Sequence, residues 1–118
     1  MNLLVVDDNS VNRMLVVIMG EYQGWSCSEA ESGREALDKL ARDPVDVILL
    51  DISMPGMSGD EICRKIKSDP ALPKPRIVAY TAHVLPDEIR VIMDAGFDGF
   101  LCKPFTEEQL LKAVLASD

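Results

Sequence analysis

The sequence predicts an α/β domain, built as a doubly wound, five-stranded parallel sheet flanked by five helices in a three-layer sandwich. Short apolar runs alternate with segments of helical periodicity along the whole chain, which is typical of repeated βα units. Four of these runs end abruptly at a polar residue, as buried parallel strands do at the edge of a sheet. The 118 residues are enough for a sizeable core, and we expect a single domain over residues 1–118 with no separate output domain.

Five short segments are expected to form the strands. Ser26–Glu29 is the least apolar of them, which favours a place at an edge of the sheet. The other four are followed directly by polar side chains. These runs and the residues that end them are Leu3–Val6 at Asp7 and Asp8, Val47–Leu50 at Asp51, Ile77–Tyr80 at Thr81, and Phe100–Cys102 at Lys103.

The first helix is expected to begin at a cap formed by Asn9 or Ser10 and to end before Gly24. Its apolar residues recur with helical spacing, which predicts a stripe facing the core. Val16 and Val17 lie off this stripe and are expected to face solvent. The stripe consists of Val11, Met14, Leu15, Ile18, Met19 and Tyr22.

Four further helices are indicated by capping signals. Ser32 with Glu35, Ser58 with Glu61 and Thr106 with Gln109 have the spacing of a capping box, and Pro86 suits the first turn of a helix that ends near Gly96. Pro44 and the Asp69-Pro70 pair end the second and third helices. The residues expected to face the core are Ala36, Leu37 and Leu40, then Ile62 and Ile66, then Ile89, Ile92 and Met93, and finally Leu110, Leu111, Val114 and Leu115.

Three carboxylates are expected to meet at one edge of this sheet. Open sheets of the flavodoxin type have the strand order 2-1-3-4-5, and we adopt this order for the flavodoxin-like sandwich expected here. The first and third strands then lie about 4.8 Å apart, which brings together Asp7, Asp8 and Asp51. Two carboxylates about 4 Å apart repel by about 4 kcal/mol at an effective dielectric constant of about 20. A divalent cation would relieve this repulsion, and an all-oxygen ligand set suits Mg²⁺.

Composition excludes several classes of protein. The net charge of -8 argues against a nucleic-acid-binding surface, which would need a basic patch. No apolar stretch has the length of a signal-peptide core or a membrane span, so we expect a cytoplasmic protein that does not bind membranes. Cys27, Cys63 and Cys102 are widely spaced, and we expect them to be reduced thiols.

The polar residues at the strand ends identify a family. Asp7-Asp8, Asp51 within the segment Asp51–Gly59, Thr81-Ala82, and Lys103-Pro104-Phe105 resemble the receiver domain of two-component response regulators over essentially the whole chain. The resemblance implies that Asp51 accepts a phosphoryl group from the phosphohistidine of a histidine kinase or a histidine phosphotransfer protein.

The resemblance also assigns a role to each side chain of the site. It implies that Mg²⁺, for which Mn²⁺ is expected to substitute, binds Asp8 and Asp51 directly, Asp7 mainly through water, and the backbone carbonyl of Ser53. Lys103 and Thr81 with Ala82 would contact the phosphoryl group. The protein would then be a signalling phosphoacceptor that assists only its own phosphorylation and dephosphorylation, not an enzyme.

Receivers also suggest how the phosphoryl group becomes a signal. Phe100 matches an aromatic residue that rotates inward and reshapes the surface of the fourth helix, fifth strand and fifth helix, where a downstream protein target docks. A permanently buried Phe100 is the alternative, and the lack of a hydroxyl predicts an inward bias. Ser53 and His83 occupy positions that tune phosphoryl lifetime in receivers, although we expect His83 in the first place to be an exposed loop residue. Donor helices dock on the first helix, so we expect the exposed Val17 to contribute to docking.

Two other classes share parts of this pattern. Dehalogenase-like phosphatases also use an aspartate nucleophile and Mg²⁺, but they need a second acid where this chain has Ser53. An FMN-binding flavodoxin-like protein needs a phosphate cradle where this chain has Asp7-Asp8-Asn9. Within the receiver family, Met1 directly before the first strand favours a stand-alone regulator or phosphorelay shuttle, whereas Asp8-Asn9 and Asn12-Arg13 resemble receivers of hybrid histidine kinases.

Overall fold

Five strands alternate with five helices in this computed structural model, which describes residues 1–82 and 85–115, so that His83 lies outside the described residues. The strand segments are close to those predicted. The strands are β1 (Asn2–Val6), β2 (Ser26–Ala30), β3 (Val47–Asp51), β4 (Arg76–Thr81) and β5 (Gly99–Cys102). The helices are α1 (Ser10–Tyr22), α2 (Gly33–Arg42), α3 (Gly59–Ser68), α4 (Pro86–Ala95) and α5 (Glu107–Leu115).

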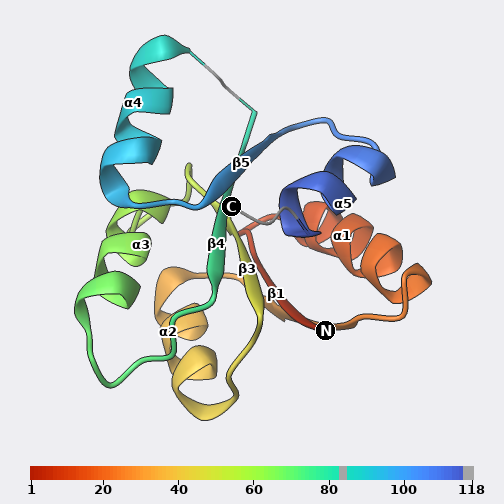
Figure 1. Cartoon of the computed structure of the whole chain (residues 1–118), viewed down its shortest axis with the longest axis horizontal. Coiled ribbons are helices and arrows are strands. Elements are labelled where there is room, and N and C mark those ends of the chain that lie inside the picture. Colours follow the sequence, from red (N-terminus) through yellow and green to blue (C-terminus); the bar gives the residue numbers. More distant parts are fainter. Residues whose placement is uncertain (83–84, 116–118) are drawn as a thin grey trace.

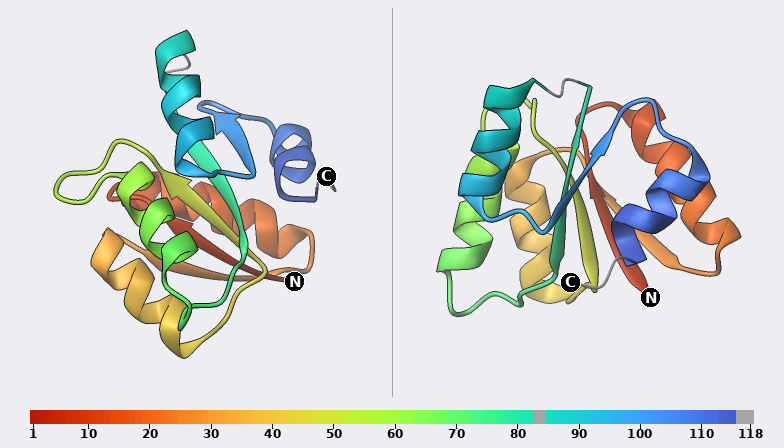
Figure 2. Two further views of the ribbon diagram at one scale, coloured as in Figure 1. Left: turned by 60° about the vertical axis from the view of Figure 1, so that its left-hand side comes forward. Right: turned by 45° about the horizontal axis from the view of Figure 1, so that its top comes forward.

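All five strands are parallel and lie in the order β2-β1-β3-β4-β5, which confirms the predicted order and the edge position of β2. Figure 1 and Figure 2 show the sheet between two helical layers, with α1 and α5 on one face and α2, α3 and α4 on the other. The register pairs Val6 of β1 with Leu50 of β3. The residues next after Val6 and Leu50, Asp7 and Asp51 respectively, therefore emerge side by side.

Alternation along the strands divides the core between the two faces. Leu4 and Val6 point towards α2 and α3, whereas Leu3 and Val5 point towards α1 and α5, and all four are fully buried. Burial of every residue of β3, and of every residue of β1 after Asn2, is typical of central parallel strands. The rigid centre of the sheet thus carries two of the acidic side chains.

Most helix ends follow the predicted signals. Asn9 caps α1 by accepting hydrogen bonds from the amides of Val11 and Asn12, and Thr106 and Gln109 form a reciprocal capping box at α5. At α3 the expected box is incomplete, because the Ser58 hydroxyl bonds the Glu61 carboxylate and caps no backbone amide.

The buried face of α1 differs from the prediction. Val16 and Gly20 are fully buried and Val17 is half-buried, whereas the predicted core stripe is largely exposed. Two contacts explain why α1 is rotated about its axis relative to the prediction. Gly20 lets the helix approach β2 so closely that an added Cβ would lie 2.5 Å from the Cys27 sulfur. The Arg13 guanidinium donates a hydrogen bond to the Asp7 carbonyl oxygen, which holds the first turn of the helix. The exposed residues, which we call the α1 apolar face, are Val11, Met14, Leu15, Ile18 and Tyr22.

Smaller differences affect two other helices. Met93 of α4 and Leu115 of α5 were expected in the core but are 64% and 57% exposed. In α5 the buried residues are Leu110 and Val114, one turn apart, so a narrower stripe is enough to cover this edge of the sheet. Among the described residues, no helix has the length and apolar character needed to cross a membrane.

Candidate functional site

Asp7 stands directly after β1 and is almost completely buried, with 1% of its surface exposed. Its Oδ1 accepts a hydrogen bond from the backbone amide of Asn9 at 2.9 Å. Its Oδ2 accepts hydrogen bonds from the side-chain amide of Asn12 and from the Lys103 ammonium, at 3.1 Å each. Burial alone would raise the pKa of Asp7, but the Asn9 amide and Lys103 outweigh it and hold this pKa below its ordinary value. Asp7 is therefore a buried, ionised carboxylate.

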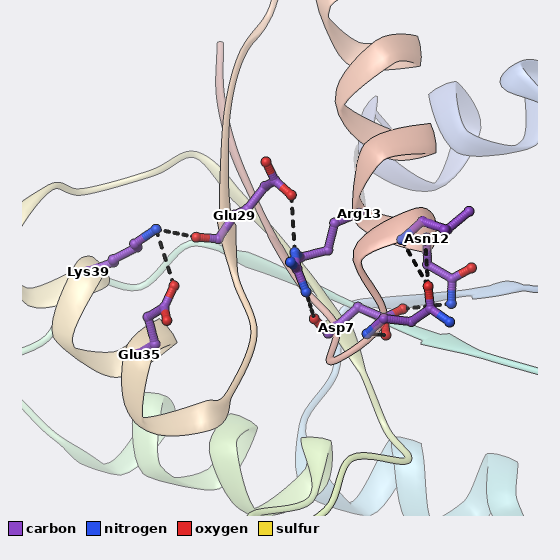
Figure 3. A network of polar contacts seen from close by, with 8 residues as sticks. Asp7, Asn12, Arg13, Glu29, Glu35 and Lys39 are labelled. Carbon is purple, nitrogen blue, oxygen red and sulfur yellow. Dashed lines mark hydrogen bonds and ion pairs between the residues drawn. The ribbon is translucent and has the colours of Figure 1, made fainter.

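A polar network fixes the backbone at Asp7 (Figure 3). The Arg13 guanidinium donates to the Asp7 carbonyl oxygen at 2.7 Å and forms an ion pair of 3.0 Å with Glu29 of β2. The Lys39 ammonium of α2 bonds the Glu29 carbonyl oxygen and lies 3.4 Å from Glu35. The network links α1, β2 and α2 to the residue that follows β1.

Asp51 ends β3 and is 5% exposed. Its Oδ1 accepts the amide of Ser53 at 3.0 Å, and its Oδ2 lies 3.4 Å from the Lys103 ammonium. Burial raises the pKa of Asp51 to about 6, with Asp7 adding to the rise and the Ser53 amide and Lys103 opposing it. At neutral pH the carboxylate is ionised, although this form is costly to bury. A nearby cation would relieve that cost.

Asp8 completes an acidic cluster. Ligand oxygens of Asp7, Asp8 and Asp51 all lie within 4.8 Å of one another, and Asp8 is exposed while the other two are buried. Three converging carboxylate oxygens with one open side are the kind of donor set that Mg²⁺ prefers, because this ion keeps several waters alongside a few carboxylates. The three carboxylates fit a divalent cation both by charge and by donor type.

Lys103, the residue after β5, contacts two members of this cluster. The register of β4 and β5 and a 2.8 Å hydrogen bond from the Lys103 amide to the Thr81 carbonyl oxygen bring its backbone beside Thr81. Its side chain extends towards the first and third strands, where the ammonium contacts both Asp7 and Asp51 and lies 4.0 Å from the centre of the Tyr80 ring. The Lys103 ammonium, which follows β5, thus contacts residues at the ends of β1, β3 and β4.

The remaining predicted residues lie around this centre with different exposure. Thr81, at the end of β4, is 3% exposed, whereas Ala82 and Ser53 are exposed. Phe100 is 42% exposed, so neither a permanently buried side chain nor the predicted inward bias describes this structure. Phe100 is exposed because it lies on β5, which is an edge strand. Leu101, its neighbour, is the buried residue of this strand and points towards α5. On the face to which Phe100 points, α4 packs mainly on α3 and does not cover the Phe100 side chain.

Four residues that contact the site carried no role in the sequence prediction. Asn12 and Arg13 bind Asp7 from the first turn of α1, and their polar character just after the cap is a signal that the sequence offers. Tyr80 is part of an apolar run and offers no such signal. Gly59, at the start of α3, packs so closely on β3 that an added Cβ would lie 2.5 Å from the Asp51 carbonyl oxygen.

A model of the response regulator receiver domain family matches residues 3–115. The chain belongs to this family. Its relatives include the sensor histidine kinase GacS of Pseudomonas protegens, which is 37% identical over 95% of this chain, and the response regulator MprA of Mycolicibacterium vanbaalenii, which is 39% identical over 97%. The receiver spans 12% of the length of GacS and 48% of the length of MprA.

Solved structures share the receiver's fold. The chemotaxis protein CheY4 of Vibrio cholerae matches with a TM-score of 0.88 and 32% identity, covering 94% of this chain and 92% of its own. The receiver domain of the sensor histidine kinase PA1611 from Pseudomonas aeruginosa matches with a TM-score of 0.85 and 27% identity, covering 98% of each chain. That domain has a magnesium ion coordinated in its active site cleft.

Proposed function

We propose that this receiver accepts a phosphoryl group on Asp51 from a phosphohistidine donor, in a Mg²⁺-dependent reaction, and signals through the surface formed by α4, β5 and α5. The observation that carries the proposal is the position of the Asp51 carboxylate, which lies between two further carboxylates and one ammonium group. A lone buried aspartate would have no such means of balancing charge. The other chemistry at this site follows from these four groups.

In the proposed transfer, an oxygen of the ionised Asp51 attacks phosphorus, the phosphorus–nitrogen bond of the donor breaks, and the histidine nitrogen keeps the electron pair. Phosphoryl transfer needs positioning and neutralisation of charge on the transferred oxygens. Mg²⁺, held by Asp8, Asp51 and the Ser53 carbonyl with Asp7 acting mainly through water, would supply part of that neutralisation. Mn²⁺ is proposed to substitute for it.

Lys103 is proposed to supply the rest of the positive charge. Its ammonium already lies 3.4 Å from Asp51, so a phosphoryl group on that carboxylate would form within reach of it. Thr81 would donate its hydroxyl to the same group, with Ala82 beside it, and Ser53 would influence how long the phosphoryl group persists. The receiver would thus assist its own phosphorylation and dephosphorylation without acting on other substrates.

The signalling step is proposed to involve Phe100. This aromatic side chain is 42% exposed on β5, next to an α4 that packs mainly on α3. Inward rotation of Phe100 upon phosphorylation would change the surface that a downstream protein target meets. A phosphoryl group needs a differential affinity of only a few kcal/mol for two such states to shift their populations.

The α1 apolar face is the proposed docking surface for the donor, in place of Val17. Leu15 and Met19 line a hollow of about 280 Å³ that also borders Lys103 and Phe105, so this surface continues to the lysine that contacts Asp51. Five exposed apolar side chains on one helix are typical of a surface that contacts another protein. A histidine kinase or a histidine phosphotransfer protein that places its phosphohistidine near Lys103 would cover it. The protein is proposed to act in the cytoplasm without binding nucleic acid.

The proposal is tested by phosphotransfer. Histidine kinases and phosphotransfer proteins carrying a radiolabelled phosphohistidine are mixed with the receiver and Mg²⁺. We expect the label to move from at least one donor to the wild-type receiver and not to Asp51→Asn. Transfer to Asp51→Asn at the wild-type rate would contradict the assignment of Asp51, and failure of wild type with every donor and with acetyl phosphate would contradict the function.

A further inference from the structure

Tyr80 lies between the core and the phosphoryl-acceptor site. It is the residue before Thr81 in β4, and it is 1% exposed. Its ring packs with the apolar residues beneath α1 and α5, and the ring of Phe105 meets it in an edge-on arrangement with 5.9 Å between the centroids. The orientation of Tyr80 is therefore fixed by packing on this side.

The same ring contacts the cation of the site. The Lys103 ammonium lies over the Tyr80 ring, 4.0 Å from its centre, while it contacts Asp7 at 3.1 Å and Asp51 at 3.4 Å. The face of an aromatic ring attracts an ammonium group, most strongly where water is excluded. Lysine has a long, flexible side chain, so the contact with the Tyr80 ring restricts where the Lys103 ammonium can lie.

The hydroxyl of Tyr80 lies near the acidic cluster. Burial, together with the nearby charge of Asp7, raises the pKa of Tyr80, so the hydroxyl stays protonated beside the ionised Asp7. A single side chain therefore lies against the cation and near one of the carboxylates of the site.

We propose that Tyr80 is a positioning residue for phosphoryl acceptance, whose ring holds the Lys103 ammonium beside Asp51. This inference rests on the proposed function. It assigns to Tyr80 a role that an ordinary apolar residue at the same position of β4 would not supply. Tyr80 acts through Lys103 and does not itself contact the phosphoryl group.

A double-mutant cycle separates this role from core packing. The rate of phosphorylation by acetyl phosphate and Mg²⁺ is measured for wild type, Tyr80→Leu, Lys103→Met and the double variant. When Lys103 is present, Tyr80→Leu is expected to lower the rate of phosphorylation about fivefold, in line with the loss of a partly desolvated cation–π contact. When Lys103 is replaced by methionine, Tyr80→Leu is expected to change the rate of phosphorylation less than about twofold, because the ring then has no ammonium group to hold. The effects of two residues that act through one another are not additive.

Two further variants serve as controls. Tyr80→Phe keeps the ring and loses only the hydroxyl, so its rate is expected to stay within about twofold of wild type and above that of Tyr80→Leu. Val78→Ala weakens the same apolar layer, two residues earlier on the same face of β4, and is expected to leave the rate unchanged. Equal slowing by Tyr80→Leu in both backgrounds, or slowing by Val78→Ala of the same size, would overturn the proposal.

Wild-type protein offers a second test that does not depend on the folding of a variant. The methylene protons next to the Lys103 ammonium are expected to resonate upfield in NMR spectra because they lie over the ring. Lys112, whose side chain is 78% exposed, is the matched reference. Identical shifts for the two lysines would overturn the proposal. A wild-type receiver that gains no phosphoryl group at all would instead contradict the proposed function.

Discussion

Replacing Asp51 by asparagine is expected to stabilise the metal-free protein at neutral pH. Burial raises the pKa of Asp51 from 3.8 to about 6, so the folded protein binds this proton more tightly than the unfolded chain does. The stabilisation from the protonated form is fully present below about pH 4 and is lost as the pH rises through about 6. Above that pH, the folded protein carries the cost of a buried, ionised Asp51.

The size of this cost follows from the shift. About two pKa units correspond to about 3 kcal/mol, at about 1.4 kcal/mol per unit. Asp51→Asn removes the ionisation, and Lys103 keeps its 3.1 Å contact with Asp7. We therefore expect the variant to exceed wild type in free energy of unfolding by about 3 kcal/mol at pH 7.5 and by about 1 kcal/mol at pH 4.5.

Urea unfolding in the presence of a chelator, carried out at both pH values, measures these two differences in the free energy of unfolding. Asp38→Asn, which removes an exposed carboxylate of α2, is the matched control and is expected to change the free energy of unfolding by less than about 0.5 kcal/mol. A difference between Asp51→Asn and wild type that is the same at both pH values would refute the reasoning. It would mean that burial does not disfavour the ionised form of Asp51.

Three further predictions concern the metal, the switch and the donor. Saturating Mg²⁺ at about 100 times its dissociation constant should raise the free energy of unfolding of wild type by about 2.7 kcal/mol. Thermal unfolding should reveal a smaller gain for Asp8→Asn, and an equal gain would contradict the ligand assignment. Beryllium fluoride with Mg²⁺, a mimic of the phosphoryl group, should change the side-chain NMR signals of Phe100; unchanged signals would exclude it from the switch. Leu15→Glu should slow transfer from a phosphohistidine donor about tenfold by charging the docking surface, while sparing acetyl phosphate. Leu115→Glu, on the exposed side of α5, is its control, and equal slowing with both phosphoryl sources would rule out docking.

The fold and the acidic cluster could be predicted because they depend on local patterns. Each apolar run fixes a buried strand, and a parallel arrangement brings all the carboxyl ends to one edge of the sheet. The positions of Asp7, Asp8 and Asp51 therefore follow from where two strands, the first and the third, end. The strand order itself came from a known fold and was confirmed.

The orientation of α1 could not be predicted from periodicity. Apolar residues occur almost all round this helix, so several stripes satisfy the same spacing rule. The choice depends on tertiary contacts: the close approach of Gly20 to β2 and the anchoring of Arg13 by the Asp7 carbonyl oxygen and Glu29. These contacts turn Val16 inward and leave Leu15 on the surface.

The role of Tyr80 was hidden for a similar reason. In the sequence it is one more large residue of a buried strand, and its burial agrees with that interpretation. Only the folded chain brings the ammonium of Lys103, from the end of β5, over its ring. The exposure of Phe100 likewise depends on how α4 packs, which the pattern of β5 does not determine.

The central claim is that Asp51 accepts a phosphoryl group with the help of a divalent cation. Intact-mass measurement after incubation with acetyl phosphate tests it most directly, with wild type and Asp51→Asn each examined in Mg²⁺ and in a chelator. We predict one added phosphoryl group on wild type in Mg²⁺ and none in the other three samples. Folded wild type that gains no phosphoryl group in Mg²⁺, or Asp51→Asn that gains one at the same rate, would contradict the claim.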